Sequence, residues 1–197
     1  MLNLSKLLAK CTNDSFKCVK VVQGVANTLN GHVLIRRRVD APDGIYQISA
    51  DGNLLPEPNP HLFTYPNIER LRPKWFDDLD TDGTLKKVPN CRLTNSDVSR
   101  IIEFINIEDS EKSKEVCLQA DRITLGASPD IMTCQLNMPL PLVFSRDYMR
   151  IVLNEMLHYP MVVMVQDGIP ETSDAPYPLF IGKNWSSCAL IMPIFER

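Results

Sequence analysis

The feature that most constrains the fold is a pattern that occurs three times: a short amphipathic helix followed by apolar strands. In each predicted helix the apolar residues recur at i, i+3, i+4 and i+7 or close to it, which is the period of one helix face. They are Leu4, Leu7, Leu8 and Cys11; Val98, Ile101, Ile102 and Ile105; and Tyr148, Ile151, Val152 and Met156. Thr94 or Asn95 is placed to cap the second helix, and Ser145 the third. The pattern predicts an α+β fold of repeated modules, each a helix plus antiparallel strands.

Short apolar runs follow each predicted helix and indicate strands. The predicted strands are Lys17–Val25 and His32–Val39, then Glu115–Leu125 and Ile131–Asn137, then Met161–Gln166 and Ser187–Ile194. A further short apolar strand is expected to lead into the third helix. Gly168 to Pro178 is expected to be a proline-bearing loop.

The stretch from Ala41 to Asn90 differs from the rest of the chain. It holds seven prolines together with three Asp-Gly pairs that indicate turns. Because proline fixes φ and lacks an amide donor, a long helix or a central strand is excluded there. We expect a short hairpin and a connector, with a domain boundary near Trp75 to Thr84. The predicted division is an abbreviated domain over residues 1–84 and a complete domain over residues 85–197.

Composition places the chain among ordinary globular proteins and gives little sign of a particular ligand. Its 197 residues are 44% hydrophobic and 23% charged, and the net charge of −3 provides no bulk attraction to nucleic acid. The N-terminal MLNLSKLLAKC is too short and polar for a signal peptide, and the longest apolar run, Met161 to Val165, is too short for a membrane span. A cytoplasmic location with no membrane partner is the resulting expectation.

The six cysteines are scattered and form no C-x-x-C pair. In a cytosolic protein this pattern favours reduced thiols. A metal site is the alternative, although the ligands lack the usual paired spacing.

Motifs for catalysis are absent from the sequence. There is no phosphate-binding glycine loop, no dinucleotide fingerprint, no nucleophile elbow and no H-E-x-x-H zinc motif. The three histidines, His32, His61 and His158, have no recognisable nucleophile–base spacing. The acidic pairs Asp77-Asp78 and Asp80-x-Asp82 lie in the polar connector and indicate a solvated loop, with a metal or acid–base role as the alternative. We therefore expect a protein without catalytic residues, cofactor or metal, and an unrecognised α+β enzyme stays as an alternative.

Three stretches, in order, resemble the bacterial β sliding clamp, the DNA polymerase III β subunit that tethers the replicative polymerase to DNA. Thr28 to Leu34 (TLNGHVL) is similar to the T-D-G-H-R-L turn and strand of the central clamp domain. Its Asn30-Gly31 pair is also a hairpin signal on physical grounds. Tyr65 to Leu71 (YPNIERL) is similar to F-P-D-Y-x-R-V, which closes that domain. Ala189 to Ile194 (ALIMPI) is similar to the terminal V-V-M-P-M strand.

The resemblance covers most of the chain after Val21 and is most specific for residues 85–197. The chain departs from the family in three ways. A bacterial clamp has three domains, the motif arginine is replaced by Val33, and the C-terminal ending is Phe195-Glu196-Arg197. The shortness fits a phage-encoded variant, and it puts closure of the usual two-subunit ring in doubt.

The resemblance implies a peptide-binding pocket and polymerase partners. In the family one apolar pocket binds short linear motifs of DNA polymerases and other proteins. Leucine and aromatic anchors of a peptide need such a concave apolar site. The residues that match this pocket are Thr28, Gly31, His32, Leu34, Pro66, Arg70, Leu71, Leu190, Met192, Pro193 and Ile194. On composition alone the apolar members are better explained as strand core.

The resemblance also implies a DNA-facing side, because clamp rings turn their helices toward duplex DNA. The matching cations are Lys6, Lys10, Arg100, Arg146 and Arg150. Lys6 and Lys10, like Arg146 and Arg150, are i, i+4 pairs that share a helix face, so they would contact phosphates without reading sequence. Ordinary solvated helix faces explain them as well. In the basic run Arg36-Arg37-Arg38, strand alternation sends Arg36 and Arg38 to one face and Arg37 to the other, and its role stays open.

Assembly and mode of action are the remaining predictions. A clamp ring contains twelve helix-plus-strands modules, and three are predicted here, so four copies would close a homo-oligomeric ring. A monomer or dimer is the alternative. The leading hypothesis is a processivity or recruitment factor. The second is a clamp mimic that sequesters host replication proteins without encircling DNA.

Overall fold

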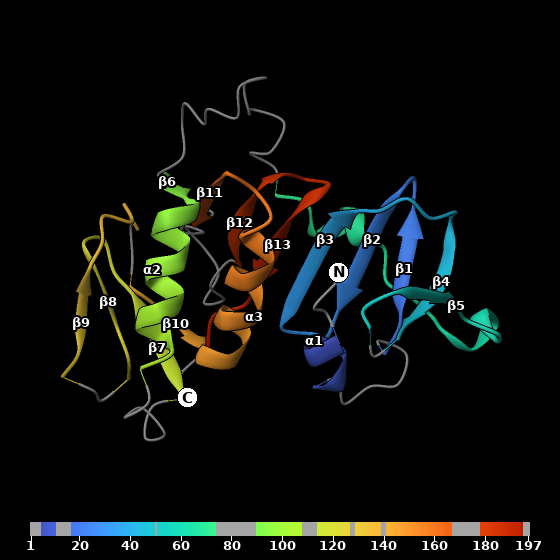
Figure 1. The fold of residues 1–197 in the computed structure, drawn as a ribbon, viewed down its shortest axis with the longest axis horizontal. Helices are drawn as coiled ribbons and strands as arrows, with labels where there is room; N and C mark the ends of the chain where they lie inside the picture. Colours follow the sequence, from blue (N-terminus) through green and yellow to red (C-terminus); the bar gives the residue numbers. More distant parts are fainter. Residues whose placement is uncertain are drawn as a thin grey trace.

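Two antiparallel sheets and three α-helices form the part of the chain that the computed structural model describes, which is residues 5–10, 17–49, 51–73, 90–107, 114–126, 129–138, 141–166 and 178–194 (Figure 1). The helices are α1 (Ser5–Ala9), α2 (Asn95–Ile105) and α3 (Arg146–Met156), with short 3-10 turns η2 (Pro60–Leu62) and η3 (Ile68–Leu71). The strands are β1 (Val19–Val22), β2 (Val25–Leu29), β3 (Val33–Arg38), β4 (Gly44–Ile48), β5 (Leu54–Pro56), β6 (Asn90–Thr94), β7 (Glu115–Leu118), β8 (Arg122–Thr124), β9 (Ile131–Thr133), β10 (Leu142–Ser145), β11 (Met161–Gln166), β12 (Leu179–Asn184) and β13 (Ser187–Ile191).

The larger sheet has nine strands and joins the two ends of the sequence. Its order is β5-β4-β1-β2-β3-β13-β12-β11-β6. The first five strands come from the N-terminal part and the last four from the C-terminal part. They meet where β3 pairs with β13, with Leu34 opposite Leu190 and Arg36 opposite Cys188. The smaller sheet has the order β10-β7-β8-β9 and comes entirely from the C-terminal part.

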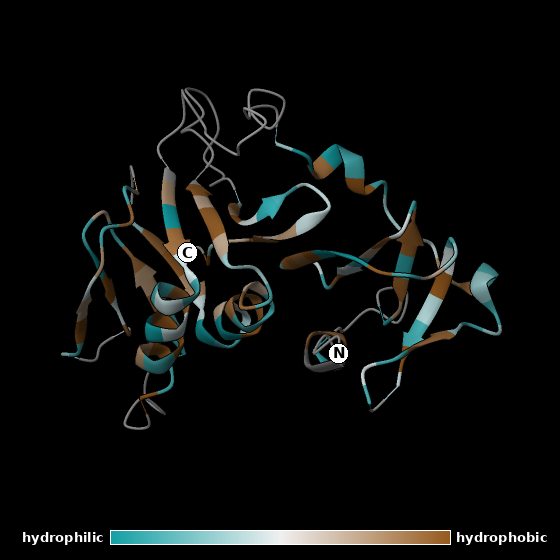
Figure 2. Ribbon diagram, turned by 45° about the horizontal axis from the view of Figure 1, so that its top comes forward, coloured by the Kyte–Doolittle hydropathy of each residue, from teal (hydrophilic) through white to brown (hydrophobic). Residues whose placement is uncertain are grey.

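The main core lies between the two sheets and the helices. Val98, Ile101 and Ile105 of α2 are buried, as are Met149 and Leu153 of α3. They pack with the inward residues of β3, β6, β7, β10, β11, β12 and β13. Hydrophobic residues therefore dominate the central strands, whereas hydrophobic and hydrophilic residues alternate along the helices (Figure 2). Burial of this apolar face, more than helix propensity, holds α2 and α3 in place.

The predicted hairpins and helices are largely found. Asn30-Gly31 turns β2 into β3, with Gly31 at φ +87° and the Asn30 side chain accepting hydrogen bonds from the amides of His32 and Val33. The hairpin predicted after Ala41 is β4–β5. Thr94 caps α2, but Ser145 makes no side-chain cap for α3. The expected apolar strand before α3 is β10.

Three predicted strands are wrong in extent, two of them because a tight turn interrupts the segment. The segment Lys17–Val25 contains all of β1, a turn and the first residue of β2. Gln23 and Gly24 both have positive φ, as a two-residue hairpin turn requires. Glu115–Leu125 is likewise the hairpin β7–β8, and Ile131–Asn137 ends as a strand at Thr133.

Several predictions cannot be placed. The boundary predicted near Trp75 to Thr84 lies outside the described residues, so the division at residues 84 and 85 stays a prediction. The Gly168 to Pro178 loop also lies outside them except for its last residue. Within the described ranges, no helix has the length and apolar character needed to cross a membrane.

The first testable prediction concerns the start of α2. Thr94 and Asp97 form a capping box, in which the Thr94 hydroxyl bonds to the amide of Asp97 and the Asp97 carboxylate bonds to the amide of Thr94. Thr94→Ala is expected to lower the free energy of unfolding by about 1 kcal/mol. Urea denaturation measures it, with Ser96→Ala, an exposed position in the same turn, as the control; equal stability of the two variants would contradict the cap.

The same cap predicts a pH dependence. The pKa of Asp97 is lowered, chiefly by the hydrogen bond from the Thr94 side chain. The contribution of the ionised Asp97 carboxylate to the free energy of unfolding is therefore fully present above the ordinary pKa of a carboxyl group. It is lost as the pH falls through the lowered pKa. In Thr94→Ala the stability difference from the parent protein should shrink at low pH.

Candidate functional site

An apolar cluster lies on the face of the nine-stranded sheet that is turned away from the main core. Leu34 of β3 and Leu190 of β13 face each other across the strand pair and belong to this cluster. Its other buried members are Ile68, Val163, Val165, Phe180, Trp185 and Cys188, with Leu29 and Tyr65 packed against it. We call this face the outer face. The cluster is the point at which residues from β2, β3, η3, β11, β12 and β13 meet.

The segment from Tyr65 to Leu71 lies against this cluster. The Tyr65 hydroxyl donates to the carbonyl oxygen of Asn27 on β2 at 2.7 Å, and the Ile68 side chain is buried in the cluster. Asn67 caps η3 by accepting from the amide of Glu69 at 3.1 Å. These contacts bring the second of the three family-like motifs beside the first and the third.

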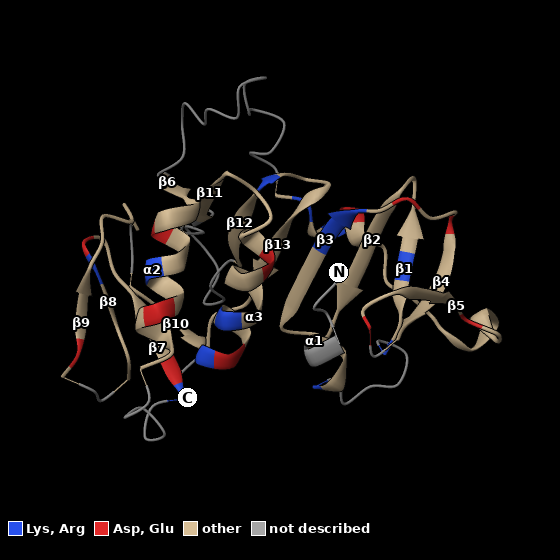
Figure 3. Ribbon diagram, viewed as in Figure 1, with Lys and Arg blue, Asp and Glu red and all other residues tan. Residues whose placement is uncertain are grey.

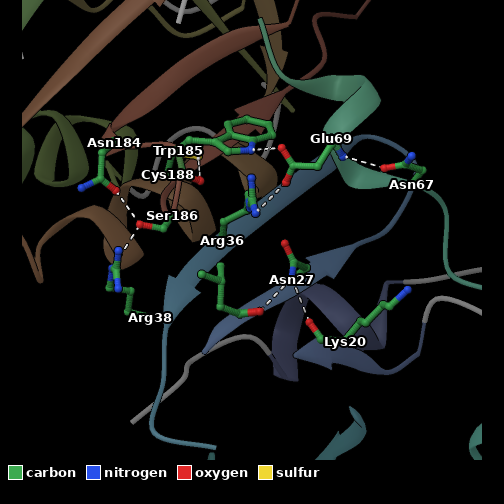
Figure 4. Close-up of polar contacts among 11 residues, drawn as sticks. Lys20, Asn27, Arg36, Arg38, Asn67, Glu69, Asn184, Trp185, Ser186 and Cys188 are labelled. Carbon is green, nitrogen blue, oxygen red and sulfur yellow. Dashed lines mark hydrogen bonds and ion pairs between the residues drawn. The ribbon is translucent and has the colours of Figure 1, made fainter. Parts of the chain in front are cut away.

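A charged and aromatic group forms the edge of the cluster (Figure 4). The guanidinium of Arg36, a side chain only 8% exposed, donates through Nη2 to Oε1 of Glu69 at 3.1 Å. It also lies over the Trp185 ring, 4.2 Å from the centroid. The indole nitrogen of Trp185 donates to Oε2 of the same carboxylate at 2.9 Å. Glu69 is 57% exposed, so solvent screens its ion pair with Arg36. The main effect of the Glu69 carboxylate is therefore to fix the side chains of Arg36 and Trp185.

A groove of about 760 Å³ lies beside this group. Its walls include strands β1, β2 and β3 on one side, the 65–72 segment on another, and the turn between β12 and β13. Four cationic side chains line it, Lys20, Arg36, Arg38 and Arg72, against the single carboxylate of Glu69 among the described residues. The groove is therefore basic in a chain whose net charge is −3.

The turn that carries Trp185 depends on Gly182. The register between β12 and β13 shifts between Gly182 and Asn184, which is the mark of a bulge. A Cβ at Gly182 would lie 2.4 Å from Cβ of Cys188 and 2.7 Å from the backbone oxygen of Ser187. Only glycine therefore permits the two strands to approach this closely, and the approach places Trp185 beneath Arg36.

The structure brings some of the predicted pocket residues together. Leu34 and Leu190 share the apolar cluster with Ile68, and Pro66 lines the groove.

The other predicted pocket residues differ in exposure. Leu71 is 43% exposed and Met192 is 38% exposed. Arg70 and Ile194 are also exposed, Pro193 is buried, and Gly31 forms the β2–β3 turn. The Met192 amide extends the β3–β13 ladder by donating to the His32 carbonyl oxygen at 2.8 Å.

Two predicted pocket residues lie elsewhere. Thr28 is opposite Ile35, so its side chain lies on the core side of the sheet and not with Leu34; Leu29, one residue later, takes that place. The shift of one residue moves a strand side chain to the opposite face. The ring of His32 stacks on Tyr148 of α3, with centroids 5.7 Å apart, so it lies on the helix side.

The predicted DNA-facing cations mostly have partners within the chain. Lys10 pairs with Asp147 and lies over the Tyr148 ring. Arg150 bonds to Asp147 at 2.7 Å, and Arg146 donates to the carbonyl oxygens of Ile105 and Ile107 at 2.6 and 3.0 Å. Arg146 therefore satisfies the C-terminal end of α2.

The remaining cations do not make the helix side uniformly basic. Arg100 is exposed, and the side chain of Lys6 lies outside the described residues. Figure 3 shows acidic and basic residues side by side on α2 and α3. A DNA-facing role for these five residues stays a prediction.

The described cysteines are free thiols: Cys18, Cys91, Cys117, Cys134 and Cys188. Burial raises the pKa of Cys91 to about 11 and also raises that of Cys188, so both thiols remain protonated and poorly nucleophilic at neutral pH. No group of three or more His, Cys, Asp or Glu side chains suited to a metal ion occurs among the described residues.

The sequence analysis missed the role of the basic residues of β3 and the turn that carries Trp185. The alternation of Arg36, Arg37 and Arg38 was predicted correctly, since Arg36 and Arg38 line the outer groove while Arg37 pairs with Glu155 of α3. The pairing of Arg36 with Glu69 and Trp185 had no local signal, because the three residues are far apart in sequence.

Solved structures of bacterial sliding clamps are similar to nearly the whole chain. The DNA polymerase sliding clamp of Pseudomonas aeruginosa, solved with a ligand, matches with a TM-score of 0.54 at 12% identity, over 99% of this chain and 64% of that one. The Bacillus subtilis clamp matches with a TM-score of 0.55 at 14% identity, over 98% and 62%. The Helicobacter pylori beta clamp bound to a DNA ligase peptide matches with a TM-score of 0.55 at 11% identity, over 98% and 62%.

These likenesses establish the fold. The chain has the α+β sliding-clamp fold, as predicted, and spans less than two thirds of the length of the clamps it matches. No protein-family model and no curated protein matches the sequence.

The second testable prediction concerns the bulge at the site. Gly182→Ala is expected to destabilise the fold by about 1–3 kcal/mol, because the strands must separate to admit the methyl group. Thermal unfolding measures the loss, and a shift in fluorescence in a Trp75→Phe background, where Trp185 is the remaining tryptophan, reports the displaced turn. Lys183→Ala, at the exposed neighbouring position on β12, is the control; a Gly182→Ala protein as stable as this control would contradict the close approach.

Proposed function

We propose that this chain is a clamp-like, non-catalytic binding protein that recruits DNA polymerases or related proteins through short peptide segments. The observation that carries the proposal is the meeting of Leu34, Ile68 and Leu190 in one apolar cluster at the β3–β13 junction. The peptide would place leucine or aromatic anchors against this cluster. The sliding-clamp fold supports the proposal, as does the DNA ligase peptide bound to the Helicobacter pylori clamp.

The wall of the proposed pocket includes exposed apolar side chains. Leu71 follows Ile68 on η3, and Met192 continues from β13; both leave large apolar surfaces open to solvent. Such surfaces can be covered by a ligand at little cost in desolvation. The flexible thioether of Met192 also suits several related peptides. The proposed pocket therefore comprises Leu29, Leu34, Pro66, Arg70, Leu71, Leu190, Met192 and the neighbouring Pro193 and Ile194.

The third testable prediction is the loss of peptide binding when this wall is cut back. Met192→Ala and Leu71→Ala are each expected to raise the Kd for a polymerase clamp-binding peptide roughly fivefold, corresponding to about 1 kcal/mol of lost apolar contact. Isothermal titration calorimetry measures the change. Ile131→Ala removes a similarly exposed apolar side chain from β9, away from the pocket, and serves as the matched control. Unchanged affinity in both pocket variants would remove the support for the pocket.

Encirclement of duplex DNA is a separate part of the proposal. Its support is that α1, α2 and α3 lie on one side of the nine-stranded sheet, where a ring would turn them inward (Figure 1). A four-copy ring would then bring Arg100 and the other helix-side cations toward phosphates. The alternative, a clamp mimic that binds partners without a ring, requires only the peptide pocket.

The fourth testable prediction separates these alternatives. A ring-forming protein should show four times the mass of one chain in light scattering, and it should stay on circular plasmid DNA but slide off linear DNA. The expected contrast is topological, so it should resist salt concentrations that remove ordinary phosphate contacts. A monomer that still binds the peptide and leaves both DNA forms equally would support the mimic.

A further inference from the structure

Among the described residues, Arg36 is a basic side chain that the fold buries without satisfying all of its N–H groups. Its Nη2 bonds to Glu69, but Nε and Nη1 have no hydrogen-bond partner among the described residues. Trp185 covers one face of the guanidinium and offers that face no acceptor. Buried N–H groups of a charged side chain are strongly unfavourable when unpaired. Since Arg36 lines the outer groove, a ligand with an anionic acceptor in that groove would satisfy it.

Asn27 provides an unpaired group of opposite kind on the neighbouring strand. It lies directly across from Arg36 in the β2–β3 pair and also lines the groove. Its Nδ2 donates to the carbonyl oxygens of Lys20 and Val25 at 3.0 and 2.8 Å, which fixes the orientation of the amide. Its Oδ1 is buried and has no donor among the described residues. A ligand that offers a hydrogen-bond donor as well as an anion would therefore satisfy both residues.

Chemistry favours a peptide over a simple anion as the occupant. Inorganic phosphate can accept from Arg36 and donate to Asn27 through its hydroxyl, but it has no apolar part for the adjoining cluster, and a free carboxylate has an acceptor but no donor. A peptide with an acidic side chain has both, since its backbone amides donate. Tyr65, Ile68 and Trp185 belong to both the groove lining and the apolar cluster, so one extended peptide can cross from one to the other.

We infer that the groove of Arg36 and Asn27 is a second subsite, which takes an acidic residue flanking the apolar anchors of the bound peptide. The inference rests on the proposed peptide-binding function and adds a requirement for the partner's sequence. Lys20 and Arg38 raise the positive potential around the subsite, while Glu69 orients Arg36 (Figure 4). Partners with Asp or Glu beside their anchors are thus preferred over neutral ones.

The fifth testable prediction uses paired peptides. Each peptide is amidated and has one leucine and one phenylalanine anchor. The acidic peptides have Asp-Glu next to the anchors and the neutral peptides have Ser-Gln, and each pair is made with this flank on the N-terminal side and again on the C-terminal side. For one of the two sides the acidic flank should lower the Kd about tenfold at low salt, and less at 0.5 M NaCl, because exposed charges are screened. Arg36→Gln should abolish this difference between the acidic and the neutral peptide. Arg122→Gln removes an exposed arginine from β8 and is the matched charge control.

The outcomes distinguish the subsite from the pocket. Equal affinity of acidic and neutral peptides, or an undiminished preference in Arg36→Gln, overturns the subsite and leaves the pocket intact. If neither anchored peptide binds, the proposed function fails. An acidic peptide without anchors is then titrated in a Trp75→Phe background, where Trp185 is the remaining tryptophan. A fluorescence change that Arg36→Gln removes supports the subsite, and no change overturns it.

A second variant covers loss of folding in Arg36→Gln. The double variant Lys20→Gln/Arg38→Gln alters side chains that are not fully buried, and it removes two charges from the same groove. The preference for the acidic flank should fall about threefold in it. A full preference in the double variant would overturn the subsite.

Discussion

The antiparallel pairing of β3 with β13 is the contact on which the rest of the structure depends. It joins strands from opposite ends of the sequence into one sheet of nine. The ladder also settles which side chains share a face, because directly opposed residues point the same way. Leu34 and Leu190 consequently meet on the outer face, while Ile35 and Ala189 enter the main core. Without this pairing, the three family-like motifs would have no common surface.

The two faces of this sheet use their cations differently. On the helix side, Lys10, Arg146 and Arg150 bind carboxylates or carbonyl oxygens and thereby hold α1, α2 and α3 together. On the outer face, Arg36 is held by Glu69 and Trp185, but two of its nitrogens have no hydrogen-bond partner in the described part of the chain. Charges that are satisfied within the fold contribute to its stability. A buried charge that is only partly satisfied is more informative about a ligand.

The proposed pocket and its acidic subsite are continuous because the same aromatic and apolar residues border both. Ile68 is buried in the cluster, and Trp185 forms part of the cluster and of the groove. The close approach at Gly182 fixes the turn that carries Trp185. Peptide recognition by this chain would then combine two contributions. The apolar anchors would supply most of the affinity, and the oriented charge of Arg36 would select among peptides.

The sequence by itself determined the local elements. The period of the apolar residues located α2 and α3, Thr94 marked the start of α2, Asn30-Gly31 marked a hairpin, and alternation assigned the faces of Arg36 to Arg38. These features depend on neighbours a few residues away, so local rules suffice. The three ordered motifs also led to the sliding-clamp fold.

Tertiary structure alone decided how these elements combine. Strands β6 and β12 were not predicted: β12 has no clear alternation, and both strands are stabilised by partners distant in the sequence. Thr28 was placed on the wrong face, since a strand's facing is settled by the register of its pairing. Arg146 was expected to face DNA, but the approach of α2 gave it carbonyl oxygens to bind. The group of Arg36, Glu69 and Trp185 exists only because the β3–β13 ladder and η3 bring three distant segments into contact.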